Sequence, residues 1–521
     1  MAFKSSSLAE AVMERLVTLF SPTRGWSTRL WRSSPIDALR HCLDLVEGNA
    51  RDGAKNYALN EARRLIKGDL FIPPRDRGGV LKQLSISSDK VIHGTTMHFA
   101  LKSLVDELAQ NYSSWVQSYL DDLDADVDVA SSPVSGEKLA WQLAAFLRSE
   151  GMSDQWIANF ATYQLRHDKE VVTLAVAINR ARNSAAAGSG WTFFVPLTRR
   201  RGFNVIAPPL LQKAQFEERF EDLLPGVQVP ENRGGVEIRV EAIDKYAAIN
   251  EAQLALRRVV ERHRASHSKR VLTFATEGWV SPGSWSVPLS LEPDLGIGIR
   301  ELDSGGGRDM FEQASEELEA ALDLLTAADQ TSSRAATIAA WATLETLFAG
   351  EGDFGDLASV ADRAADVLVC MYVRDTFTAL ATKHARSGDD DLAIALREAN
   401  KTEAARLVET ALPAHSMSVA SGGGLLARER AVTLNANEVI AIRAQLAAVF
   451  RRLYDMRNQI VHAGRMAPYG LNRTYAESAV LLSALLDELL HQHREPGRTA
   501  REVAGRAACV SDGRKVSHFA G

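Results

Sequence analysis

The stretch Asn437–Ala463, NEVIAIRAQLAAVFRRLYDMRNQIVHA, decides the fold of the second half of the chain. Its apolar residues recur every three or four positions, and this spacing predicts one long amphipathic helix. At about 100° per residue, the apolar stripe through Leu453 continues through Arg457 to Val461. The pattern therefore predicts a guanidinium on the inward face of a helix, where it needs an anionic partner or a polar cleft.

A carboxylate suited to this guanidinium stands in a second expected helix, residues 333–349. Glu345 follows Trp341 by four positions and shares the apolar stripe of that helix. An unpaired buried charge is costly, so two opposite charges on the inward faces of one bundle most simply meet each other. We therefore predict an ion pair between Arg457 and Glu345.

His462 stands five residues after Arg457 and two residues before Gly464, where the helix is expected to end. Five residues of a regular helix turn through about 140°, so the two side chains of one chain do not converge on one ligand. We expect instead that two copies related by a two-fold axis each contribute an arginine and a histidine to a shared cleft. A histidine at a helix end is accessible, and it titrates in the physiological range.

Structural explanations exist for each of these residues. Arg457 could serve only to join two helices through an ion pair. His462 could interact only with the dipole at the carboxyl end of its helix. Asn458 could be an exposed polar residue, and for Glu345 the structural role, orienting Arg457, is the one we favour.

The rest of the chain predicts a mainly α fold with three parts and a tail. Residues 1–130 form an N-terminal helical region, and residues 137–303 form a small α/β module whose long helix begins at Asp244. Residues 495–521 are expected to be a mobile tail. Residues 309–494 form a helical bundle, with helices near 310–328, 333–349, 356–387, 391–411, 437–463 and 474–493.

Composition limits the function classes. The 521 residues are 46% hydrophobic and 24% charged, with a net charge of −6, which argues against a protein that coats DNA. Cys42, Cys370 and Cys509 are too few and too far apart for a zinc ribbon or a disulfide framework, which favours a reducing cytoplasm. We expect no membrane span, no metal site and no cofactor.

Two features of the bundle resemble a known family. The run Arg457 to His462 matches the R-x4–6-H motif of HEPN domains, with Asn458 in the frequent polar position after the arginine. The segments AAWATLETLF and LASVADRAADVL resemble the opening helices of the Apea-like HEPN group. The resemblance covers roughly residues 309–494.

The resemblance implies a metal-independent endoribonuclease that acts as a homodimer on an RNA substrate. His462 would move a proton at the ribose 2′-hydroxyl or at the leaving 5′-oxygen. Arg457 would hold the scissile phosphate, and Asn458 would orient the phosphate or the histidine through its amide. The products would be a 2′,3′-cyclic phosphate and a 5′-hydroxyl, and DNA would be spared because it lacks the 2′-hydroxyl.

The family also suggests a setting and leaves alternatives. The first 300 residues would recognise a trigger, a partner or the substrate, in bacterial stress response or phage defence. One alternative is a non-catalytic HEPN module that binds RNA or a nucleotide, or that mediates dimerisation. A second alternative is a toxin of a toxin–antitoxin pair, held inactive by an antitoxin protein.

Overall fold

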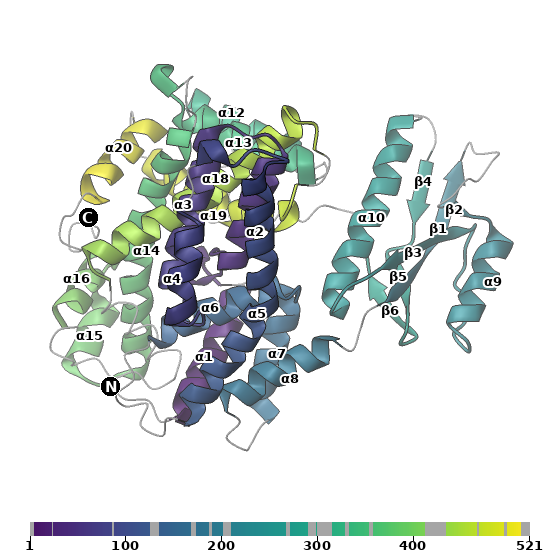
Figure 1. The fold of residues 1–521 in the computed structure, drawn as a ribbon, viewed down its shortest axis with the longest axis horizontal. Helices are drawn as coiled ribbons and strands as arrows, with labels where there is room; N and C mark the ends of the chain where they lie inside the picture. The colour runs from purple at the N-terminus through teal and green to yellow at the C-terminus, as the bar shows by residue number, and fades with distance from the viewer. Residues whose placement is uncertain are drawn as a thin grey trace. The chain divides into compact units, whose positions relative to one another are not determined.

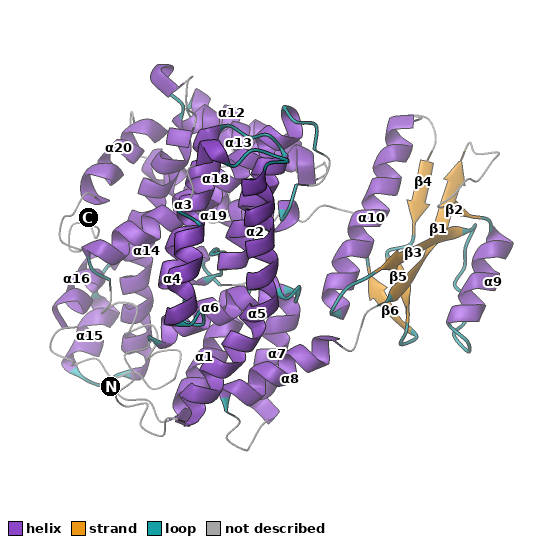
Figure 2. Ribbon diagram, in the orientation of Figure 1, coloured by secondary structure: helices purple, strands orange, loops and turns teal. Residues whose placement is uncertain are grey.

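The fold is mainly helical, with a small antiparallel sheet in the middle of the chain, as the sequence predicts (Figures 1 and 2). The structure is a computed structural model of the chain. The described part of the chain comprises residues 5–22, 24–85, 88–125, 135–167, 173–186, 190–201, 210–266, 271–289, 298–299, 315–328, 333–353, 358–411, 434–465, 468–493 and 498–511.

The chain divides into two compact units. The first unit combines residues 1–149, 161–177 and 294–521, and the second combines residues 150–160 and 178–293. The helical region predicted at 1–130 and the bundle predicted at 309–494 therefore belong to one compact unit. In sequence, the second unit is an insertion between them.

The first unit is helical throughout its described residues. None of its described helices is long and apolar enough to cross a membrane. Its N-terminal helices are α1 (Ser5–Phe20), η1 (Trp26–Thr28), α2 (Pro35–Glu47), α3 (Asp52–Gly68), α4 (Pro74–Gln83), η2 (Ser88–Lys90), α5 (Thr96–Ala125) and α6 (Gly136–Ser149). Its C-terminal helices are α12 (Glu316–Ala328), α13 (Ser333–Phe348), η4 (Glu351–Asp353), α14 (Ala358–Ser387), α15 (Asp391–Glu398), α16 (Lys401–Ala411), α18 (Ala436–Val461), α19 (Leu471–His493) and α20 (Ala500–Ser511).

The C-terminal helices differ from the predicted ones at two places. The helix expected over 391–411 is two helices, because the Asn400 side chain accepts a hydrogen bond from the Glu403 N–H and begins α16. The tail expected to be mobile contains α20, which packs against α14 and buries Ala500, Ala504 and Ala507. Alanine side chains supply this contact, and their small apolar surface gives only a weak signal for a helix in the sequence.

The second unit is built on one strand with alternating side chains. Phe193, Val195 and Leu197 face α10 across one core, and Phe194 packs against α9 across another. The sheet order is β2-β3-β1-β5-β6, every pair is antiparallel, and β4 pairs with the second half of β1. The elements are β1 (Trp191–Arg201), β2 (Leu210–Leu211), α9 (Lys213–Leu223), β3 (Gly235–Val240), α10 (Lys245–Ser266), β4 (Val271–Phe274), β5 (Glu277–Ser281) and β6 (Trp285–Pro288).

Two further helices, α7 (Asp154–His167) and α8 (Leu174–Ala186), contribute residues to both units. The predicted start of α10 is confirmed. Asp244 accepts hydrogen bonds from the N–H groups of Tyr246 and Ala247 and caps the helix.

Helix α18 carries a buried arginine that its apolar pattern does not reveal. Arg452 donates from Nη1 to Glu61 Oε1 on α3 at 2.6 Å and from Nη2 to Glu477 Oε2 on α19 at 3.4 Å. Glu477 also accepts a hydrogen bond from Arg148 Nη1 on α6 at 2.6 Å, and all four side chains are buried. Burial by itself would lower the pKa of Arg452, but the two carboxylates raise it above its usual value. Two cations and two anions therefore join four helices.

Replacing Arg452 by alanine should destabilise the first unit strongly. The substitution leaves the Glu61 carboxylate buried without its partner, and we expect the free energy of unfolding to fall by about 3–5 kcal/mol. Urea denaturation followed by circular dichroism measures the loss.

The matched control is Arg75→Ala on α4, where the arginine side chain is 85% exposed. A surface change of this kind should alter the free energy of unfolding by about 0.5 kcal/mol or less. Equal stability of the two variants would show that the buried network does not hold the helices together.

Candidate functional site

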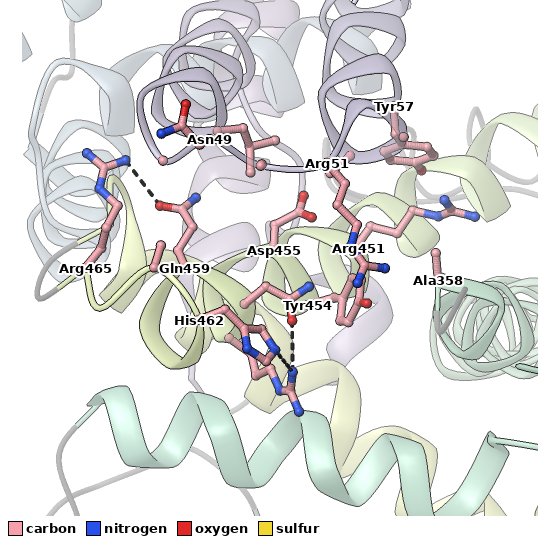
Figure 3. A pocket seen from close by; sticks show the side chains of 18 of the residues that line it. Asn49, Arg51, Tyr57, Ala358, Arg451, Tyr454, Asp455, Gln459, His462 and Arg465 are labelled. Carbon is pink, nitrogen blue, oxygen red and sulfur yellow. Dashed lines mark hydrogen bonds between the residues drawn. The ribbon is translucent and has the colours of Figure 1, made fainter. Parts of the chain in front are cut away.

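A cavity of about 1040 Å³ opens at the carboxyl end of α18 (Figure 3). One wall is the last three turns of α18 with the turn that follows, and the other is the link between α2 and α3. Ala358, at the start of α14, lines it as well. All of these residues lie in the first unit.

The α18 wall is a polar face. Asp455, Asn458, Gln459 and His462 line the cavity, and they are spaced three, four and seven positions apart. This spacing places side chains on one side of a helix. The side chains of Asp455 and Gln459 are buried, whereas His462 is exposed beyond the end of the helix.

Arg457 and His462 meet within one chain, which corrects the prediction that they diverge. Arg457 Nη1 lies 3.0 Å from His462 Nε2 (Figure 3). Their backbone positions are separated as in a regular helix, since His462, the C-cap residue, has helical backbone angles and its N–H bonds to the Asn458 carbonyl. The long arginine side chain then spans the remaining gap. A second copy of the chain is not needed to bring the two groups together.

Asn458 supports the arginine directly. Its Oδ1 accepts a hydrogen bond from Arg457 Nη1 at 2.9 Å. The same nitrogen thus contacts both Asn458 and His462, which fixes the end of the guanidinium at the cavity. The amide contacts Arg457, whereas the resemblance implies a contact with phosphate or the histidine.

The predicted pair between Arg457 and Glu345 does not form. The Glu345 carboxylate accepts a hydrogen bond from Trp341 Nε1 on its own helix, and the Trp341 ring lies 4.7 Å from that of Tyr454. The prediction placed Val461 on the inward stripe, but Val461 is 46% exposed. Arg457 is only half-buried, and it lines the cavity.

The wall opposite α18 comes from the N-terminal region, and Arg465 holds it in place. Arg465 Nη1 donates to the carbonyl of Asp44 at 2.7 Å and lies 2.6 Å from its carboxylate. It also contacts Gln459 Oε1 at 3.3 Å on α18, and its Nη2 lies 3.6 Å from Glu47. One side chain thus fastens the end of α2 to the turn after α18.

Asp455, which lines the cavity, belongs to a buried pair with His41. Asp455 Oδ2 lies 3.2 Å from His41 Nε2 on α2. No hydrogen-bond partner for His41 Nδ1 is present among the described residues. To one side, the Arg451 guanidinium stands 4.2 Å from the Tyr57 ring centroid, and burial raises the pKa of Tyr57 to about 12. Tyr57 is therefore a neutral wall of the cavity at pH 7.

The arginines of the cavity are not equivalent. Arg451 pairs with Asp362 at 2.6 Å, and Arg465 pairs with Asp44 and Glu47. Arg51 and Arg457 form no ion pair within the described part of the chain. These two cations face the cavity from opposite walls, so the cavity suits a ligand that carries negative charge.

Sequence reasoning missed the N-terminal contribution to this site. Nothing local marks His41 or Asp44, because their partners Asp455 and Arg465 lie hundreds of residues away. Nothing local marks Arg51 either, since only the fold brings it to the cavity. Asp455 could have been found, since it precedes His462 by seven positions and so shares its side of the helix. Across the described residues, no group of three or more histidine, cysteine, aspartate or glutamate side chains is arranged to hold a metal ion.

Comparison of the chain with protein-family models, with curated proteins and with solved structures finds no match. The site is therefore interpreted from its own geometry.

The Arg465 clamp can be tested by substitution. Arg465→Ala leaves the buried Asp44 carboxylate, whose Oδ2 already lacks a partner among the described residues, without its cation. We expect the free energy of unfolding to fall by about 1–3 kcal/mol in urea denaturation. Adding Asp44→Asn should recover part of the loss, because a neutral amide is less costly to bury than a charge. Unchanged stability of Arg465→Ala would argue against the clamp.

Proposed function

We propose that the chain is an endoribonuclease that cleaves RNA through the ribose 2′-hydroxyl at the Arg457–His462 site. The observation that carries the proposal is the 3.0 Å contact between these side chains in an open cavity. The resemblance of the motif to HEPN domains points to the same chemistry, and it requires no metal ion.

The hydrogen bond assigns roles to the two side chains. A guanidinium has only donors, so in this contact Nε2 of His462 accepts. A neutral imidazole can take the proton of a ribose 2′-hydroxyl. The 2′-oxygen then attacks phosphorus, and the bond from phosphorus to the 5′-oxygen breaks. The imidazolium can return its proton to the leaving 5′-oxygen, giving a 2′,3′-cyclic phosphate and a 5′-hydroxyl.

Arg457 is suited to the phosphate because no carboxylate competes for it within the described residues. Its guanidinium can donate to the non-bridging oxygens as charge develops on them. When the guanidinium turns from Nε2 of His462 to a phosphate oxygen, Nε2 becomes free to take the 2′-hydroxyl proton.

The assembly and setting follow from the resemblance. We propose a homodimer in the cytoplasm, acting in bacterial stress response or phage defence, with a regulatory or antitoxin protein as a further partner. Because both reacting groups come from one chain, the proposed chemistry does not itself depend on the second copy.

The proposal predicts cleavage of labelled RNA by the purified protein in EDTA, with no cleavage of DNA of the same sequence. Arg457→Ala and His462→Ala should each lower the rate by a factor on the order of 10² or more. Mass spectrometry of the products should find the 2′,3′-cyclic phosphate. Arg75→Ala and His491→Ala, which change an exposed arginine and an exposed histidine outside the cavity, should cleave like the wild type.

Two results would contradict the proposal. Equal cleavage by the wild type and both site variants would identify a contaminating nuclease. Binding of RNA without cleavage would favour a non-catalytic binding module instead.

A further inference from the structure

A second, smaller cavity of about 310 Å³ lies elsewhere in the first unit. It is lined by residues before α2, by Arg64 of α3, by Trp141 of α6 and by Gln445 of α18, among others. Its volume is at the lower end of the range for small-molecule sites. Two of the residues that line it, Arg32 and Arg64, are arginines that form no ion pair within the described part of the chain.

Arg32 is the first of these groups. Its guanidinium stands 4.5 Å from the ring centroid of Trp141 and 5.2 Å from that of Trp31. The Nε atom is buried and has no hydrogen-bond partner among the described residues. Burial lowers the pKa of Arg32, although Tyr372, Glu438 and Glu137 act in the opposite direction. Two indole faces are a weak substitute for the water that this cation has lost.

Arg64 is the second. Its one hydrogen bond in the described structure is a long one, from Nη1 to the Ala441 carbonyl at 3.4 Å, and it forms no ion pair there. The charge of Arg64 further lowers the pKa of Arg32, so the two guanidinium groups repel each other beside one cavity. Such an arrangement is stabilised by an anion placed between them.

The carboxylates that line the cavity do not supply that anion. Glu137 is held by Arg15 Nη2 at 2.7 Å and by Trp141 Nε1 at 2.7 Å. Asp69 accepts a hydrogen bond from Tyr112 Oη at 2.7 Å and others from two backbone N–H groups. Glu438 attracts Arg32, but no ion pair forms between them. Lys138, exposed at the rim, adds a further cation.

We propose that this cavity is a binding site for a small organic anion, whose carboxylate or phosphate oxygens lie between Arg32 and Arg64. The planar donors of two arginines suit either oxyanion. Trp141 and Ile442 offer apolar contact to the body of the ligand. The buried Oε1 of Gln445, which lacks a partner among the described residues, can accept a hydrogen bond from a ligand donor. The site is separate from the Arg457–His462 cavity and does not depend on the proposed nuclease activity.

Thermal unfolding of the full chain, with and without added probes, tests the proposal. The probes are inorganic phosphate, adenosine 5′-monophosphate, succinate and adenosine. A ligand that binds only the folded state raises Tm, so we expect a rise with at least one anionic probe and none with adenosine. A rise with phosphate compounds alone or with succinate alone identifies which oxyanion the site takes.

Substitutions assign the response to this cavity. Arg32→Met and Arg64→Met should each weaken binding of the active probe about tenfold or more in isothermal calorimetry. Without probe, Arg32→Met should unfold at the same Tm as the wild type or a higher one, because it removes a half-buried cation whose Nε has no hydrogen-bond partner among the described residues. Arg75→Met, at an exposed position, should bind like the wild type.

Arg457→Ala shows which of the two cavities binds the probe. The larger cavity also contains arginines, Arg51 and Arg457, that form no ion pair among the described residues. The proposal holds if this variant keeps the response and the Arg32 and Arg64 variants lose it. It fails if no anionic probe raises the Tm of the wild type. It also fails if the response survives in Arg32→Met and Arg64→Met, or disappears only in Arg457→Ala.

Discussion

The buried guanidinium of Arg452 is the constraint on which the helical unit depends. A charge out of water must be matched by opposite charge in good geometry, and Arg452 is matched only when Glu61 of α3 and Glu477 of α19 both reach it. Arg148 of α6 then balances the second carboxylate. Apolar packing can tolerate small shifts between helices, but hydrogen-bonded ions cannot. The network therefore selects one arrangement of helices drawn from both ends of the chain.

The candidate site follows from that arrangement. The turn of α18 that carries Arg452 is followed directly by the turns that line the larger cavity, so fixing Arg452 against α3 also fixes the distance between the two walls. Arg465 repeats the connection at the far end, against Asp44. Between the ion pairs of Arg452 and Arg465, the link from α2 to α3 brings Arg51 opposite Arg457. The cavity is thus a product of long-range ion pairs, although Arg457 and His462 stand only five residues apart.

The spacing of residues in the sequence predicted those features that depend on neighbouring residues. The bounds of α13 and α18 follow closely from apolar periodicity, and Asp244 marks the start of α10 through its capping chemistry. The errors have physical reasons as well. The reach of the Arg457 side chain was left out of the helix geometry, and one stripe was continued to Val461, which faces solvent. His41 and Asp455 are 414 residues apart, so no local spacing could pair them.

The separation of Arg452 from Glu61 by 391 residues also has a consequence for synthesis. At about 5–20 residues per second, Glu61 leaves the ribosome on the order of 20–80 s before its partner does. Through that interval the Glu61 carboxylate stays hydrated, while the early helices can already pack on one another, as α2 does on α3 and α5. The two walls of the larger cavity cannot meet until α18 has emerged. The larger cavity therefore takes shape only near the end of synthesis.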